Sequence, residues 1–271
     1  HNHLAFFGLD SVTSFSVKLV TTFASCGDIE DAFRVFNQSP FHHIFSWAPL
    51  ISGFVDCGYG KKALEIYGSM KERGLKPSPH TIASLLRACG DIYAIVKGIE
   101  IHIYAKKEGF GDNFFIVSAL IMMYGKCGHV VEAEDVFIRL ARYDLVSWNA
   151  MLSAYVEHGL VMKAFQLFRQ MQAECIYCDA RTFVISLQAC CILARDEDSG
   201  MLDIQSFSRV IIALEIGRGL HADLKKKDPT FDIYTNNVLV SMYAKCASIV
   251  EAENVFCGMG EYRNSISWNE L

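Results

Sequence analysis

The segment Leu145–Tyr155, LVSWNAMLSAY, decides the predicted fold. Its large apolar residues are Trp148, Met151, Leu152 and Tyr155, spaced i, i+3, i+4 and i+7. This spacing places the four side chains on one face of a helix. The segment is therefore predicted to be an amphipathic helix that packs on a neighbour.

Gly159 ends this first pattern, and a second apolar face follows after a short turn. The second face consists of Ala164, Phe165, Leu167, Phe168 and Met171. Two amphipathic helices joined by a short turn predict a helical hairpin. We call its first helix A and its second helix B.

The hairpin pattern recurs along the chain at an offset of 101 residues. The matching residues are Cys26 and Cys127, Phe36 and Phe137, Trp47 and Trp148, and Cys89 and Cys190. A fixed offset indicates a repeat protein, and the 101 residues divide into units of 35, 35 and 31 residues. Stacked hairpins bury a continuous core that one hairpin cannot bury alone. The predicted fold is all-α, a right-handed superhelical solenoid of stacked helix-turn-helix repeats with a functional concave surface.

The third copy of the pattern is longer than the first two. Trp268 lies 120 residues after Trp148, which indicates an insertion of 19 residues. The segment 192–214 is the predicted position, because it carries the acidic run 196–198 followed by Ser199 and a glycine. We expect an exposed loop between two helices, poorly ordered around 196–208, that can be deleted without loss of the fold.

The phrases LVSWNAMLSAY, SALIMMYGKCG and YTNNVLVSMYAKC resemble the pentatricopeptide-repeat (PPR) family. The mixed unit length resembles its plant subgroup with alternating P, L and S repeats. Tetratricopeptide repeats keep a regular period near 34 residues and fit less well. The resemblance treats 1–271 as a single PPR array fragment: an L-repeat tail at 1–12, S repeats at 13–43, 114–144 and 233–264, P repeats at 44–78 and 145–179, L repeats at 79–113 and 180–232, the latter with the inserted loop, and the start of a P repeat at 265–271.

The resemblance implies recognition of single-stranded RNA, one base per repeat, by side chains on the concave surface. The fifth residue of helix A and the last residue of the repeat would read the base edge. The implied pairs are Asn149 with Asp179 for uracil, Ser118 with Asp144 for guanine, and Asn237 with Asn264 for a pyrimidine, cytosine favoured. Each Asn or Asp has an alternative role as a helix N-cap or turn residue.

An apolar second residue of the repeat would support the ring face of the base. These residues are Phe45, Phe115, Val146 and Tyr234, whose alternative role is ordinary core between repeats. Weaker pairs are Val17 with His43 and Ala48 with Ser78, which offer no matching amide and carboxylate. The L-repeat pairs, Ala83 with Asn113 and Val184 with Asp232, are predicted to read bases poorly.

Composition narrows the function further. The chain has 25 Lys and Arg against 30 Asp and Glu, a net charge of −5, which disfavours a duplex-DNA binder held by phosphate neutralisation. No apolar run approaches the roughly 18 residues of a membrane span, so no membrane partner is expected. Cys175 and Cys178 have zinc-ligand spacing, but no second pair completes a tetrahedral set, so no metal or cofactor is expected.

Catalysis is not expected from this segment. Plant members of the resembled subgroup often end in a zinc deaminase, which needs His-x-Glu and Pro-Cys-x-x-Cys. His221-Ala-Asp223 comes closest but has the shorter acid. The full-length protein could carry such a domain, because we expect this chain, which starts at His1 without a targeting segment, to be an internal fragment.

Two functions remain open. The first is the specificity part of an RNA-processing or C-to-U RNA-editing factor in a mitochondrion or chloroplast, working with editing or processing partner proteins. The alternative is a helical-repeat scaffold for protein–protein interaction. An acidic concave surface, with Asn149 and Asp179 buried or facing outward, would exclude RNA binding.

Overall fold

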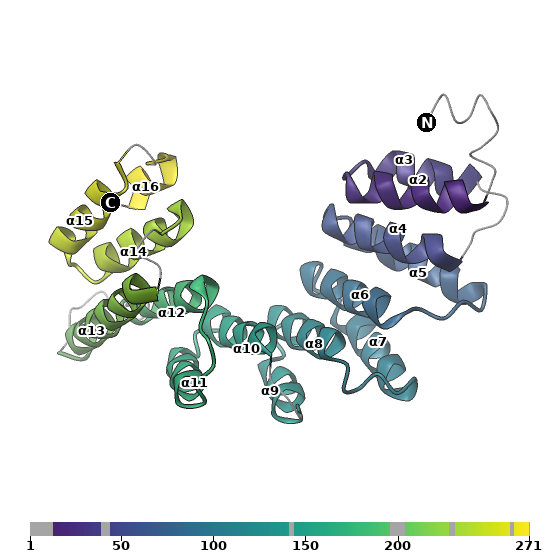
Figure 1. Cartoon of the computed structure of the whole chain (residues 1–271). Helices are drawn as coiled ribbons and strands as arrows, with labels where there is room; N and C mark the ends of the chain where they lie inside the picture. The colour runs from purple at the N-terminus through teal and green to yellow at the C-terminus, as the bar shows by residue number, and fades with distance from the viewer. Residues whose placement is uncertain are drawn as a thin grey trace. The chain divides into compact units, whose positions relative to one another are not determined.

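The regular elements in the described part of the chain are helices, shown in Figure 1. The computed structural model describes residues 13–38, 44–140, 144–195, 204–227, 231–260 and 263–270. The chain divides into two compact units, His1–Tyr143 and Asp144–Leu271, and each is described by itself.

Each unit is a succession of helical hairpins. The first unit contains α2 (Thr13–Ser25) with α3 (Ile29–Gln38), α4 (Ile44–Asp56) with α5 (Gly60–Glu72), α6 (Pro79–Asp91) with α7 (Ile95–Lys107), and α8 (Phe114–Lys126) with α9 (Val130–Ile138). The second contains α10 (Leu145–Glu157) with α11 (Val161–Ala173), α12 (Ala180–Leu193) with α13 (Ile204–Lys227), α14 (Ile233–Lys245) with α15 (Ile249–Gly258), and then α16 (Ser265–Glu270). Every helix A therefore starts at the first residue of a predicted repeat.

The hairpins pack in two layers within each unit. Successive A helices contact one another, α2 to α4 to α6 to α8 in the first unit and α10 to α12 to α14 to α16 in the second. The B helices also contact the A helix of the following repeat, as α5 does with α6 and α11 with α12. Each hairpin thus buries its apolar surface against its neighbours, as the repeat pattern predicts.

The turn between helix A and helix B depends on a residue in the left-handed backbone region. Gly159 has φ of 69°, and its N–H donates to the carbonyl of Val156 at 3.1 Å. The next N–H, of Leu160, donates to Tyr155 at 2.8 Å. These two bonds form a Schellman cap, which glycine allows at little steric cost. The predicted break at Gly159 is confirmed.

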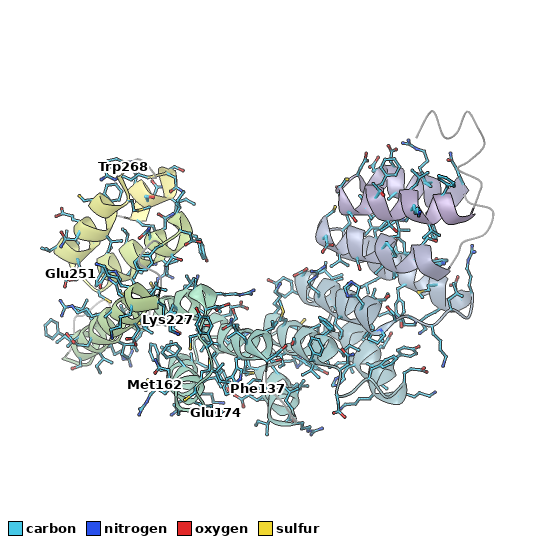
Figure 2. All side chains as sticks on the ribbon, in the orientation of Figure 1. Phe137, Met162, Glu174, Lys227, Glu251 and Trp268 are labelled. Atoms are coloured by element: carbon cyan, nitrogen blue, oxygen red, sulfur yellow. The ribbon has the colours of Figure 1, made fainter. Side chains whose placement is uncertain are left out.

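Tryptophan packs at the fourth residue of helix A in corresponding repeats. Trp47 and Trp148 are both almost fully buried, which confirms their predicted equivalence. The Trp47 ring meets Phe36 of the preceding helix B edge-on, with centroids 4.8 Å apart. Trp268, labelled in Figure 2, makes the same contact with Phe256 at 4.8 Å. A helix B aromatic and a helix A tryptophan therefore join successive repeats in both units.

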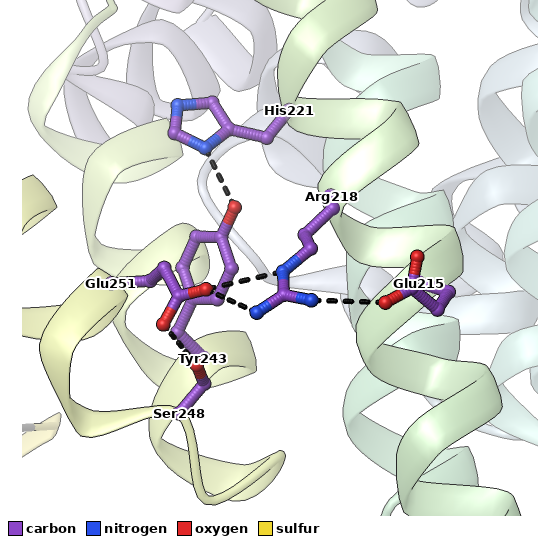
Figure 3. A network of polar contacts seen from close by, with 6 residues as sticks. All are labelled: Glu215, Arg218, His221, Tyr243, Ser248 and Glu251. Atoms are coloured by element: carbon purple, nitrogen blue, oxygen red, sulfur yellow. Dashed lines mark hydrogen bonds and ion pairs between the residues drawn. The ribbon is translucent and has the colours of Figure 1, made fainter.

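A polar contact joins helix B of each predicted L repeat to the next helix A. His221 Nδ1 forms a hydrogen bond with the Tyr243 hydroxyl (Figure 3), with 2.9 Å between the two atoms. In the first unit, His102 Nδ1 lies 2.8 Å from the Tyr124 hydroxyl. Burial lowers the pKa of both imidazoles, that of His102 to about 4. The two rings are therefore neutral at neutral pH and form part of the packing.

Arg218 connects α13 to α15 beside this contact (Figure 3). Its Nε donates to Glu251 at 3.1 Å, and its Nη1 donates to Glu215 at 2.9 Å within α13. Glu251 also accepts from the Ser248 hydroxyl at the start of α15. Arg218 and Glu215 are exposed and Glu251 is half-buried, so these ion pairs contribute little to stability.

The prediction of a loop at 192–214 is wrong for most of that segment. Residues 192–193 complete α12, and α13 already begins at Ile204, so 204–214 is helical. Residues 196–203 lie outside the described part of the chain. Phe207 and Ser208 are exposed, as expected, but on a helix. The described part of the insertion therefore lengthens helix B to 24 residues, against 13 in α7.

None of the helices in the described ranges combines the length and the apolar character that a membrane crossing requires.

Gly53 tests the close approach of α4 and α2. A Cβ at Gly53 would lie 2.7 Å from Ala24 Cβ and 3.2 Å from Ala24 Cα, so Gly53→Ala must separate the two helices. The overpacking should cost about 1–3 kcal/mol of stability, of which the higher helix propensity of alanine offsets about 1 kcal/mol. We therefore expect the urea midpoint of unfolding to fall. Gly68→Ala, which meets no atom within 4 Å, is the matched control and should raise the midpoint in the same urea titration. Equal midpoints for both variants would contradict the packing.

Candidate nucleic-acid interface

The last residue of a repeat caps the helix A that follows it. The side chains of Ser78, Asp144, Asp179 and Asp232 each accept from the backbone N–H of the third residue of the next helix, at 2.8–3.2 Å. Asn264 does the same for Ser267 at 2.9 Å. The alternative role of these residues as N-caps is therefore real, and the question is whether it leaves them able to read a base.

Asn149 and Asp179 are brought together as predicted. Asn149 Nδ2 donates to Asp179 Oδ1 at 3.2 Å across 30 residues of sequence. Thr182, the third residue of α12, completes a cluster, because its hydroxyl lies 2.8 Å from both Asn149 Oδ1 and Asp179 Oδ1. Among the described residues, every hydrogen bond to this carboxylate ends on Oδ1, which leaves Oδ2 as an acceptor.

The carboxylate of Asp179 is held in its charged form. Partial burial would raise its pKa, but hydrogen bonds from the Thr182 N–H and hydroxyl and from Asn149, together with the charge of Arg181, lower it below its ordinary value of 3.8. Asp179 is therefore a strong acceptor at neutral pH.

Asn237 and Asn264 form a second cluster of the same design. Asn237 Nδ2 donates to Asn264 Oδ1 at 3.4 Å, a long contact. Ser267, the third residue of α16, donates its hydroxyl to Asn237 Oδ1 at 2.6 Å. The structure thus brings Asn264 next to Asn237, as predicted from a repeat that is one residue longer than 114–144.

Ser118 and Asp144 belong to different units, and each is placed only within its own. The buried Ser118 hydroxyl donates to the Phe114 carbonyl at 2.9 Å, one turn earlier in α8. Asp144 accepts from the Ser147 N–H at 2.8 Å and caps α10. The guanine-reading pair stays a prediction.

The weaker candidates form no comparable cluster within the described residues. Val17 and Ala48 are half-buried and apolar, Ser78 bonds with Thr81, and His43 lies outside the described residues. The first repeats therefore retain the capping contact where it is described but lack an amide at the fifth position.

Second-position side chains are exposed on the A helices. Phe115, Val146 and Tyr234 expose 54%, 55% and 58% of their surface, which excludes the core role for these three. The side chain of Phe45 lies outside the described part. Ile266 occupies the same position in α16 and is 54% exposed, a residue that the sequence reasoning missed although it stands beside Trp268 in the third Ser-Trp copy.

A groove of about 450 Å³ runs along the A helices of the second unit. It is lined by Tyr234, Asn237 and Ile266 and by the charged residues Glu157, Arg195, Lys245 and Glu270. Two acids and two bases leave this groove without net charge. The lining of this groove is therefore not acidic.

The expectation that Asn149 is accessible is wrong. Its side chain is only 5% exposed, and Asn237 is 6% exposed, because each amide is enclosed by the cap residue and the third-position hydroxyl. Asp179 is half-buried. A base would therefore meet the cap residue first and the amide behind it.

The charge of Asp179 should appear in the pH dependence of stability. Because its folded pKa is below 3.8, its contribution is present above that value and is lost as the pH falls through the folded pKa. Asp179→Asn keeps a capping oxygen without the titration. We expect the stability advantage of the wild type over this variant at pH 6 to shrink below pH 3.8, measured by urea unfolding. A constant difference across this range would contradict the assigned charge.

Three segments of the chain match known repeats. Residues 42–91 and 143–192 match the PPR repeat family, and residues 115–145 match the PPR repeat. The chain is 34% identical over 262 residues to the chloroplastic pentatricopeptide repeat-containing protein At4g25270 of Arabidopsis thaliana, covering 94% of this chain and 45% of the relative. It is 30% identical to the mitochondrial protein At2g22410 of the same plant, covering 99% and 41%. The chain spans less than half the length of these relatives.

Two solved structures share the fold. The first is the pentatricopeptide repeat protein PPR10 in complex with an 18-nt psaJ RNA element, with a TM-score of 0.72, 18% identity, and coverage of 100% of this chain and 38% of that chain. The second is PPR10 from maize, with a TM-score of 0.58 and 19% identity over 99% and 42%. The predicted all-α fold of stacked helical repeats is confirmed.

Proposed function

Because the chain carries repeats of the PPR repeat family, we propose that it binds single-stranded RNA with one base per repeat. The observation that carries the proposal is the pair of hydrogen-bonded clusters at the fifth and last positions, Asn149 with Asp179 and Asn237 with Asn264. Exposed apolar side chains stand at the second position of the same repeats. A hydrogen-bonding pair for the base edge and an apolar support for the ring are the two parts that such recognition needs. PPR10, which shares the fold, is in complex with an RNA element.

The polarity of each cluster suggests its base. Asp179 offers Oδ2 as an acceptor, and Asn149 Nδ2 keeps a second hydrogen as a donor. Uracil presents the complement, an N3–H donor next to carbonyl acceptors. In the other cluster Asn264 turns Oδ1 toward the helix, so both amides present N–H donors, which match the N3 and O2 acceptors of cytosine. Ser118 with Asp144 is assigned to guanine, whose N1–H and N2–H₂ a carboxylate can accept.

The finer assignments belong to the same proposal. Unit lengths of 35, 35 and 31 residues support placement in the subgroup with P, L and S repeats. Relatives named chloroplastic or mitochondrial support an organellar location. As part of a longer protein, the chain would then be the specificity part of an RNA-processing or C-to-U editing factor. Loss of one processed or edited site in organellar transcripts of a knockout plant would test this role.

Binding to short RNAs tests the base assignments. With RNA parallel to the repeats and the L repeat skipped, the expected core is 5′-G-U-N-C-3′. Replacing the U should weaken binding of the chain by about 1–3 kcal/mol, measured by fluorescence anisotropy. Asn149→Ser should move the preference at that position from U toward G, since Asp179 remains as the acceptor.

Two outcomes would count against the proposal. Equal affinities for all four bases at the U position would remove the base assignment. Absence of RNA binding at low salt would remove the RNA-binding function and favour the protein-scaffold alternative. Ala48, at the corresponding position of the earlier P repeat, provides the control, because Ala48→Ser should leave the preference at the U position unchanged.

A further inference from the structure

The third residue of helix A lies behind each pair of base-reading candidates. Thr182 and Ser267 are fully buried, yet each places a hydroxyl within 2.9 Å of both members of its pair. Both residues come from the repeat that follows the fifth-position amide. A buried hydroxyl shared by two side chains in this way restricts how either can turn.

The contacts determine which way the Asn149 amide faces. The Asp179 carboxylate only accepts, so the amide atom next to Oδ1 at 3.2 Å must be Nδ2. Oδ1 of Asn149 then faces the Thr182 hydroxyl at 2.8 Å, and the single hydrogen of this hydroxyl is shared between Asn149 Oδ1 and Asp179 Oδ1, which is equally close. The hydroxyl is therefore the donor within reach of the buried Oδ1, and it adds a second contact to the one by which the carboxylate holds the N–H group.

The second cluster repeats this logic with a different cap. The Ser267 N–H only donates, so the Asn264 atom 2.9 Å away must be Oδ1. The Ser267 hydroxyl donates to Asn237 Oδ1 at 2.6 Å, while Asn237 Nδ2 reaches Asn264 only at 3.4 Å. Of these two contacts of the Asn237 amide, the one with the Ser267 hydroxyl is shorter, so it constrains the amide more strongly than the contact with Asn264.

We infer that Thr182 and Ser267 are positioning residues that set base specificity by holding the fifth-position amide in one orientation. The inference rests on the proposed function. Without the hydroxyl, the buried Oδ1 loses its donor, and the amide is held only by the 3.2 Å contact of its Nδ2 with Asp179. An amide held by one contact can tilt away from the position in which its second N–H complements uracil, so the preference for uracil falls. The hydroxyl acts through the amide and does not contact the base.

The chain contains a matched control for this test. Thr81 lies 101 residues before Thr182, is equally buried, and bonds the cap residue Ser78 at 2.9 Å. The fifth residue of the preceding repeat, which ends at Ser78, is Ala48, so no amide is present to position. Thr81→Val removes a buried hydroxyl at the same place in a helix, beside a pair that contains no amide.

The experiment compares the wild-type chain with Thr182→Val, Thr182→Ser and Thr81→Val. Each protein is titrated against RNAs that differ only in U or C at the assigned position, and its melting temperature is recorded. We expect Thr182→Val to reduce the wild-type preference for U over C by about tenfold and Thr182→Ser to restore it. Thr81→Val should lower the melting temperature to a similar extent and leave the preference intact.

The outcomes separate this inference from the proposed function. If the wild type prefers U and Thr182→Val keeps the full preference, the positioning role is wrong while RNA reading stands. If Thr81→Val loses the preference equally, the effect is one of stability and the inference is also overturned. Absence of a preference in the wild type removes the proposed base assignment itself. If Thr182→Val unfolds, an NMR measurement on Thr182→Ala without RNA replaces the binding test. We expect the side-chain amide hydrogens of Asn149 to exchange faster in this variant than in the wild type. Unchanged exchange overturns the inference.

Discussion

The cap at the start of each helix A is the interaction on which both the fold and the candidate site depend. A side chain at the end of one repeat accepts the N–H of the third residue of the next helix, as Asp179 does with Thr182 and Asp232 with Thr235, both at 2.8 Å. The contact ends one repeat and begins the helix of the next. A site built from the fifth and last residues therefore inherits its geometry from the cap.

Capping also explains how base chemistry can vary without a change of fold. Asp and Asn cap helices about equally well, because either can turn one oxygen toward the helix N-terminus. What remains on the outer side differs, since Asp keeps an acceptor and Asn keeps an amide donor. The exchange of Asp179 for Asn264 between equivalent positions of two repeats thus alters the polarity offered to a base while the helix start is preserved.

Local patterns in the sequence predicted most of the architecture, and contacts between repeats were the part they missed. Helix A starts at 114, 145, 180 and 233 because capping and apolar periodicity act within a few residues. The prediction of a loop at 204–214 was wrong because the acidic run on which it was based, at 196–198, lies before this segment. Phe207, Val210, Ile211 and Leu214 have the i, i+3, i+4, i+7 spacing of a helix. Thr182 escaped notice because its bond to Asn149 spans 33 residues and depends on the packing of α10 on α12.

The repeat with Ala48 separates the capping role of these residues from their proposed role in reading a base. Its cap residue Ser78 still bonds at 2.9 Å to the buried hydroxyl of Thr81 in the following repeat, although it has no amide at the fifth position. The cap and hydroxyl are therefore sufficient for the helix start, and they are present whether or not a base can be read. In the equivalent repeat 101 residues later, Asn149 adds an amide to the same pair of partners. The proposed reading capacity is thus a side chain added to a contact that the fold already requires, so repeats with and without this side chain can stack in one chain.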